Sequence, residues 1–174
     1  TRPIALAAIA LTAISLAIHL AAESKGKRGP QWIFKPLAST GFMLLAFECG
    51  ALQSTYGQII FVAWALSMVG DICLTSTGQA GFLAGLVSFL LGHVAFAVGF
   101  AYLAPSWPVV AASAVAVGTL GVVVFRWLKS GIPDPLKGPV IGYITVICAM
   151  VALAIGAWWT GTTWVVPVAA TLFW

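Results

Sequence analysis

Four polar side chains with acid–base chemistry lie inside or at the edge of long apolar stretches of this sequence. They are an amine (Lys35), a carboxyl (Asp71), an imidazole (His93) and a phenol (Tyr143). An ionisable side chain within a hydrocarbon environment is costly, so each one is by default a hypothesis for a functional site. Such a set suits acid–base catalysis and equally suits a proton relay in a transporter. The elements that must position these side chains follow from the rest of the sequence.

The composition excludes a water-soluble globule. Of the 174 residues, 61% are hydrophobic and only 7% are charged, whereas a soluble domain carries about 25% charged residues. A nucleic-acid binder is excluded as well, because eight scattered Lys and Arg residues form no stripe that could follow a phosphate backbone. The sequence therefore predicts an integral membrane protein, with residues 1–174 forming a single domain.

The apolar stretches predict an all-α fold, because a helix needs roughly 20 apolar residues to cross the hydrocarbon core. We read the first stretch as a retained span, since a signal peptide has a shorter apolar region. The prediction is a polytopic transmembrane helix bundle with six full spans and part of a seventh. The spans cover about 3–22, 31–50, 57–74, 80–103, 107–128 and 138–159, and the seventh starts near 163.

The distribution of basic residues predicts the orientation. Seven of the eight cations lie in or beside two connections, between spans one and two and between spans five and six. Cytoplasmic loops are enriched in Lys and Arg, so we expect these loops inside the cell and the N-terminus outside. Tryptophans are expected at the inner boundary (Trp32, Trp127) and at the outer one (Trp107, Trp158, Trp159, Trp164).

The depth of each polar side chain below the membrane boundary can be estimated from its position along its helix. At 1.5 Å per residue, Lys35 and Asp71 fall roughly 5 Å inside the cytoplasmic boundary and Tyr143 about 7 Å, while His93 falls roughly 15–20 Å in. Helical spacing also places Trp64, Ser67 and Asp71 on one stripe of span three, and Lys35, Ser39 and Phe42 on one stripe of span two. We therefore predict a polar pocket that opens to the inner leaflet.

Span four carries two different stripes. Phe89, His93, Phe96 and Phe100 share one face, which would suit the wall of a groove for an acyl chain. A neighbouring stripe of small residues predicts a close approach of another helix. Its members are Gly81, Gly85, Ser88 and Gly92.

Structural explanations for these residues remain open. Lys35 would also be satisfied by snorkelling to headgroups, and Asp71 by serving as its ion-pair partner. His93 and Tyr143 would also serve as structural hydrogen-bonding groups, and Glu48 as a residue of the outer boundary. Cys49, Cys73 and Cys148 are expected to be free. No metal site is predicted, because zinc sites need several ligands and the only histidines are His19 and His93.

The ordered motifs resemble the YhhN family of multi-span membrane proteins, whose animal members are lysoplasmalogenases. The matching pieces extend over about residues 31–159. They are Lys35-Pro36-Leu37, Gly70-Asp71-Ile72-Cys73-Leu74, the stretch from Gly81 to Phe96 that contains Gly92-His93, and Pro139-Val140-Ile141-Gly142-Tyr143. Members of this family usually have eight spans and a Ser-Asp motif near the end. Here Ala170-Thr171-Leu172-Phe173-Trp174 resembles the approach to that motif, and the second carboxylate is not part of the sequence.

The resemblance implies hydrolysis of the vinyl-ether bond of lysoplasmalogens to a fatty aldehyde and a glycerophospho-alcohol, by a multi-pass protein of the bacterial inner (cell) membrane. Protonating carbon needs an acid close to the bond, and a carboxyl group in low dielectric keeps its proton more readily than one in water. On this interpretation no cofactor is needed, and the partners are a lysophospholipid substrate and membrane lipids, with the oligomeric state open. The residues implied are Asp71 and His93 for catalysis, and Lys35, Tyr143, Ser67, Phe89 and Phe96 for substrate binding.

Two other functions remain open at this point. A proton-coupled lipid or small-solute transporter would also use buried Asp, His and Lys residues, although the sequence lacks an inverted repeat. A hydrolase of lysophospholipid esters or amides would use the same pocket. Lysoplasmalogen hydrolysis, or alternatively transport, is therefore the expectation from the sequence.

Overall fold

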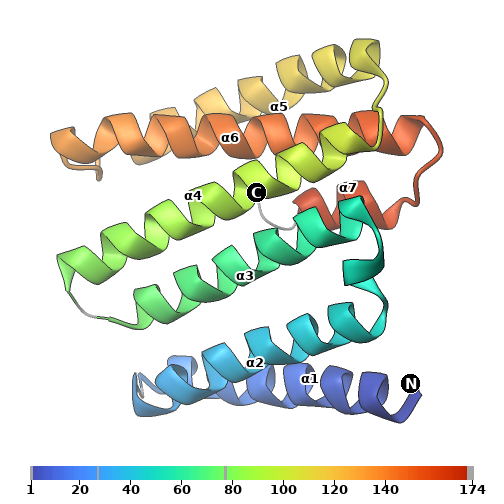
Figure 1. The fold of residues 1–174 in the computed structure, drawn as a ribbon. Coiled ribbons are helices and arrows are strands. Elements are labelled where there is room, and N and C mark those ends of the chain that lie inside the picture. The colour runs from blue at the N-terminus through green and yellow to red at the C-terminus, as the bar shows by residue number, and fades with distance from the viewer. Residues whose placement is uncertain (1, 27, 77, 172–174) are drawn as a thin grey trace. The chain divides into compact units, whose positions relative to one another are not determined.

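The regular elements of this protein are helices throughout the described part of the chain. The computed structural model describes residues 2–26, 28–76 and 78–171, and it confirms the all-α class (Figure 1). In chain order the elements are α1 (Arg2–Ser24), α2 (Arg28–Glu48), the short 3₁₀ helix η1 (Ala51–Gln53), α3 (Thr55–Thr75), α4 (Gln79–Tyr102), α5 (Trp107–Leu128), α6 (Asp134–Trp159) and α7 (Val165–Thr171).

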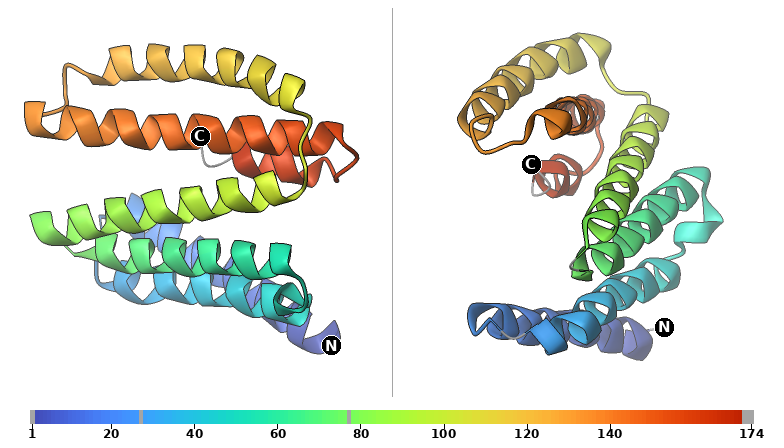
Figure 2. Two further views of the ribbon diagram at one scale, coloured as in Figure 1. Left: turned by 45° about the horizontal axis from the view of Figure 1, so that its top comes forward. Right: turned by 90° about the vertical axis from the view of Figure 1, so that its left-hand side faces the viewer.

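The helices form two compact units, Thr1–Gly92 and His93–Trp174. In the first unit α1 packs along α2, and α2 packs on α3; the pairing of α1 with α2 can be followed in both views of Figure 2. In the second unit α5 packs along α6, and α6 also contacts α7. The boundary between the units falls inside α4, so each unit is described by itself, and the single domain stays a prediction.

Five of the described helices are long and apolar enough to cross a membrane, namely α1 (from Pro3), α3, α4, α5 and α6. The protein is therefore of the multi-pass membrane type. The remaining long helix, α2, is not one of the five, and it carries Arg28, Lys35 and Glu48. The predicted count of six full spans stays a prediction because it depends on α2.

Two helices begin earlier than expected. α2 begins at Arg28, which places Pro36 inside the helix, and α6 begins at Asp134, which places Pro139 inside it. The start of α6 has a clear cause, since Pro135 lies in the first turn, where its missing N–H is not needed, and Asp134 favours a helix N-terminus. As a result, Tyr143 lies roughly 13 Å along its helix.

A tight turn connects α2 to α3. Gly50 has a φ of 79°, the left-handed conformation that commonly ends a helix, and the Ser54 hydroxyl accepts a hydrogen bond from the Gly57 amide at 3.1 Å and caps α3. A Cβ at Gly57 would lie 2.0 Å from the Ala51 carbonyl oxygen, so only glycine fits there. This turn brings the two helices back along each other as antiparallel neighbours.

The predicted stripe of small residues on α4 packs against α3. The Ser88 hydroxyl donates a hydrogen bond to the Leu66 carbonyl at 2.7 Å. A Cβ at Gly92 would lie 3.1 Å from Ser67 Oγ and 3.2 Å from the Ala63 carbonyl oxygen. The close approach that these residues predicted is therefore confirmed within the first unit.

Candidate functional site

The centre of the candidate site is an ion pair between α2 and α3. Lys35 Nζ lies 3.0 Å from Asp71 Oδ1, and the Ser39 hydroxyl donates a hydrogen bond to Asp71 Oδ2 at 3.0 Å. The exposed fractions of the Lys35 and Asp71 side chains are 27% and 22%. Both carboxylate oxygens are thus engaged by donors from α2, within a largely buried environment.

The two helical stripes predicted from spacing face each other. Phe42 on α2 and Trp64 on α3 form an edge-to-face contact with ring centroids 5.8 Å apart and an interplanar angle of 64°. Two turns further along, Lys35 and Ser39 meet Asp71. The predicted grouping of an amine and a carboxyl in one layer is therefore confirmed.

A cavity of about 370 Å³ opens beside this ion pair. Its lining comes from three helices of the first unit and combines polar with apolar side chains. The lining residues are Thr12, Leu16, His19 and Leu20 from α1, Lys35, Ala38, Ser39 and Phe42 from α2, and Asp71 from α3.

His19 is the member of this cavity that the sequence reasoning did not assign to the site. Its Nδ1 is buried and has no hydrogen-bond partner among the described residues, and its Nε2 lies 3.8 Å from Glu23 Oε2. Helical spacing did contain a clue to this assignment, because Thr12, Leu16 and His19 share one stripe of α1. The sequence alone did not reveal that this stripe of α1 would face Lys35 rather than lipid.

Ser67 lies elsewhere in the first unit. Its hydroxyl donates to the Ala63 carbonyl at 3.0 Å, and it lies beside Gly92 at the contact of α3 with α4. The spacing that placed Ser67 on the stripe of Asp71 did not distinguish a residue beside the cavity from one in the helix contact. Its role in substrate binding stays a prediction.

His93 and Tyr143 form a second polar contact, in the second unit. Their ring centroids are 5.3 Å apart with an interplanar angle of 67°; His93 is buried and Tyr143 is partly exposed. The different depths predicted for the two residues are wrong, because a ring contact requires similar depths. The early start of α6 at Asp134 is the cause, since it carries Tyr143 further from the helix end.

The other aromatic residues of α4 are described within their own units, Phe89 in the first and Phe96 and Phe100 in the second. A Cβ at Gly70 would lie 2.7 Å from the Phe89 ring, so this ring lies against α3 next to Asp71. Phe96 stacks on Phe100 with centroids 6.3 Å apart, and both side chains are buried. The predicted role of this face as a wall for an acyl chain, with Phe89 and Phe96 in substrate binding, stays a prediction.

The remaining candidate ligands are dispersed over the described residues. Cys49, Cys73 and Cys148 are free, as predicted. Within residues 2–26, 28–76 and 78–171, no three His, Cys, Asp or Glu side chains are grouped as they would be around a metal ion. The cavity described above is lined by an ammonium, a carboxylate, two hydroxyls and an imidazole.

Comparison with known proteins finds distant similarity to proteins that share one name. The chain is 27% identical over 119 residues to the protein-methionine-sulfoxide reductase heme-binding subunit MsrQ of Bordetella parapertussis and of Bordetella bronchiseptica. The protein of the same name from Bordetella pertussis is 26% identical over 119 residues. These alignments cover 64% of this chain and 57% of each relative, so less than two thirds of the relatives' length is spanned. No solved structure matches the chain.

A family profile gives the more extensive match. The profile described as the YhhN family matches residues 30–174. This range contains Lys35, Asp71, His93 and Tyr143, and it starts after His19. Because the match covers most of the sequence, the chain belongs to the YhhN family.

Proposed function

We propose that this protein is a membrane-embedded lysophospholipid hydrolase that cleaves the vinyl-ether bond of lysoplasmalogens. The observation that carries the proposal is the Lys35–Asp71 ion pair at a cavity between membrane-type helices. Membership of the YhhN family supports the reaction, because the resemblance to the animal lysoplasmalogenases rests on the motifs that contain these two residues.

The reaction consumes one water and no oxidant. An acid adds a proton to the vinyl carbon that does not bear the ether oxygen, which leaves an oxocarbenium ion. Water attacks the cationic carbon and loses a proton, giving a hemiacetal. The hemiacetal hydroxyl then gives up its proton, the glycerol oxygen takes up a proton as its bond to the former vinyl carbon breaks, and a fatty aldehyde and a glycerophospho-alcohol are released.

The cavity residues divide these tasks. Lys35 binds the phosphate of the lysophospholipid, which draws the ammonium away from Asp71 Oδ1. Asp71, still held by Ser39, is then free to carry the proton that is delivered to carbon, and its carboxylate afterwards stabilises the cation. His19 lines the same cavity and takes the proton from the attacking water. A catalytic role for His93 stays a prediction from the sequence.

The decisive experiment measures fatty aldehyde released from a lysoplasmalogen by the purified protein in lipid vesicles. We expect Asp71→Asn to lower the rate by about 100-fold or more, the effect of losing a positioned acid or base. Asp134→Asn is the matched control, because Asp134 also pairs with a lysine, Lys137, but is exposed at the start of α6. Full activity of Asp71→Asn would overturn the assignment.

The same preparation separates the alternatives. Release of fatty acid instead of aldehyde from a lysophospholipid ester would indicate an ester hydrolase. Proton-coupled uptake of solute into vesicles without any product would favour the transporter. Because the Bordetella relatives are named as heme-binding subunits, the absorption spectrum is recorded as well; an intense heme band would favour a redox protein.

A further inference from the structure

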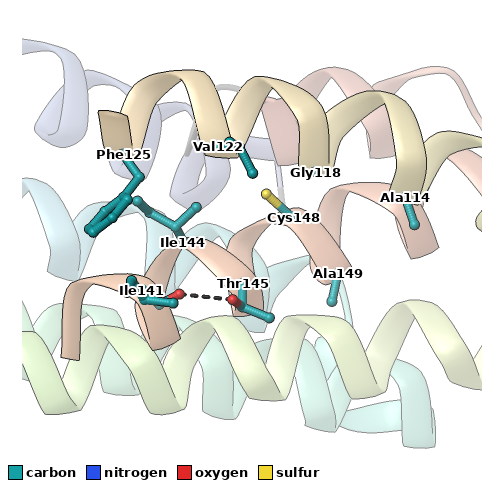
Figure 3. Close-up of a pocket in the computed structure, with 10 residues that line it drawn as sticks. Ala114, Gly118, Val122, Phe125, Ile141, Ile144, Thr145, Cys148 and Ala149 are labelled. Atoms are coloured by element: carbon teal, nitrogen blue, oxygen red, sulfur yellow. Dashed lines mark hydrogen bonds between the residues drawn. The ribbon is translucent and has the colours of Figure 1, made fainter. Parts of the chain in front are cut away.

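The second unit contains an apolar groove between α5 and α6. Its volume is about 420 Å³. Phe125 and Ile141 lie at one end and Ala114 and Ala149 at the other (Figure 3). The lining residues are Ala114, Gly118, Gly121, Val122 and Phe125 from α5, and Ile141, Ile144, Thr145, Cys148 and Ala149 from α6.

The groove presents apolar surface along its whole length. The Thr145 hydroxyl donates to the Ile141 carbonyl at 2.8 Å (Figure 3), and Cys148 Sγ lies 3.5 Å from the Val117 carbonyl oxygen. The few polar atoms of the lining are thus paired with helix backbone. The groove is hollow because Gly118 contributes no side chain, and nothing lies within 4 Å of a Cβ placed there.

The length of the groove matches one leaflet of a bilayer. From Ala114 to Phe125 the α5 backbone rises roughly 16 Å at 1.5 Å per residue. That is about half of the ~30 Å hydrocarbon thickness. An acyl chain that enters at one membrane boundary would fill a groove of this length.

Two lysines lie at the Phe125 end. Lys129 follows Phe125 by four residues and Lys137 precedes Ile141 by four, so each lies on the helical stripe that lines the groove. The two stripes end together because a short connection joins the antiparallel helices α5 and α6 (Figure 1). Lys137 also pairs with the exposed Asp134. Arg126 and Trp127 are exposed beside this end, as expected of residues at a headgroup boundary.

We propose that this groove binds the acyl chain of a single-chain anionic phospholipid, whose phosphate lies against Lys129 and Lys137. Two properties of the groove select this ligand. Its apolar length matches a single acyl chain in one leaflet, and the lysines at its end match an anionic head group. This proposal concerns the second unit and does not depend on the hydrolase activity.

A photoreactive lysophosphatidylglycerol with a diazirine in its acyl chain tests the groove in vesicles that contain the full chain. We expect crosslinks to concentrate on peptides from 114–125 and 141–149, and Gly118→Phe to reduce them at least fivefold by filling the groove. Val115→Phe is the matched control, because Val115 is an exposed residue of α5 outside the lining. Crosslinks spread evenly over the exposed helix faces, or unchanged by Gly118→Phe, would overturn the proposal.

The head-group preference is tested on the wild type and on charge variants. Unlabelled lysophosphatidylglycerol should displace the probe at a concentration at least fivefold lower than the monoacylglycerol with the same chain. Lys129→Gln with Lys137→Gln should abolish that difference, whereas Lys25→Gln, in the other basic connection, should preserve it. Equal displacement of the probe by the two lipids on the wild-type protein would contradict an anionic ligand. This comparison uses the wild type alone, so it does not depend on whether the variants fold.

Discussion

The Lys35–Asp71 pair combines two opposite requirements in one contact. Within apolar helices, each charged side chain compensates the other, whereas a single buried charge would lack a partner and destabilise the fold. As functional groups they must separate when an anionic substrate arrives. A pair with exposed fractions of 27% and 22% beside a cavity is accessible enough for such an exchange.

Removing either partner of this pair should destabilise the protein, and removing both should cost less than the two single losses added together. We expect Lys35→Met and Asp71→Leu each to lower the free energy of unfolding by about 1–3 kcal/mol, below the ~3–5 kcal/mol of a fully buried pair. The double variant should lose less than the sum, with a coupling energy of about 0.5–3 kcal/mol. Unfolding in mixed detergent micelles measures all four proteins.

The exposed pair Asp134–Lys137 is the control for this cycle. Solvent screens it, so its coupling energy should be about 0–1 kcal/mol. Additive effects of Lys35→Met and Asp71→Leu would show that the pair contributes no more than this surface contact.

His19 should act on the chemical step. We expect His19→Ala to lower kcat for aldehyde release by about 100-fold with little change in KM, and added imidazole to restore part of the rate. Rescue by a small base would not be expected if His19 only packed against the cavity. Glu23→Gln is the control, because Glu23 is 63% exposed and should leave kcat within twofold. A His19→Ala variant with normal kcat would contradict the role.

At the level of elements, the sequence predicted well where helical spacing alone decides the outcome. The stripes of Lys35 and Asp71 face each other because both follow from periodicity and a short turn. Boundaries were less accurate, since the start of α6 depends on Pro135 and Asp134 in its first turn. His19 was missed because spacing tells which residues share a face of α1, whereas the neighbour of that face is a tertiary property.

The close packing of α1 on α2 depends on Gly41. A Cβ at this position would lie 2.3 Å from Thr12 Oγ1 and 3.0 Å from the Ala8 carbonyl oxygen. We expect Gly41→Ala to lower the free energy of unfolding by about 1–3 kcal/mol through overpacking. Gly142→Ala is the control, because nothing lies within 4 Å of its added Cβ; it should be neutral or stabilising by up to about 1 kcal/mol. Equal stability of the two variants would show that α1 can shift away.

At the level of the whole molecule, the positions of the charged residues and tryptophans are those expected of a protein that lies in a membrane. Trp107 begins α5, Trp127 lies near its end, and Trp159 ends α6. All three are exposed, with fractions of 65%, 78% and 66%, which suits anchors at a membrane boundary. Composition was sufficient to predict the membrane class, whereas the division into two units depends on contacts that no composition reveals.

Cysteine labelling tests the predicted orientation together with the membrane crossings of α3, α4 and α5. In a background without Cys49, Cys73 and Cys148, we expect Gln53→Cys to react with an impermeant maleimide in intact cells. Ser130→Cys should react only after the membrane is permeabilised, because its loop is predicted to be cytoplasmic. Labelling of both positions from the same side would show that the predicted number of crossings between them is wrong.

The ion pair also has a consequence for biogenesis. A lone Lys or Asp inside a membrane-spanning helix is costly to insert, up to about 2.5–3.5 kcal/mol at the helix centre, and α2 is the long described helix that is not one of the five apolar ones. Asp71, the residue that offsets the charge of Lys35, belongs to a helix that is synthesised later. We therefore expect α2 to remain at the translocon until α3 has emerged from the ribosome, and the two helices to enter the lipid as a hairpin.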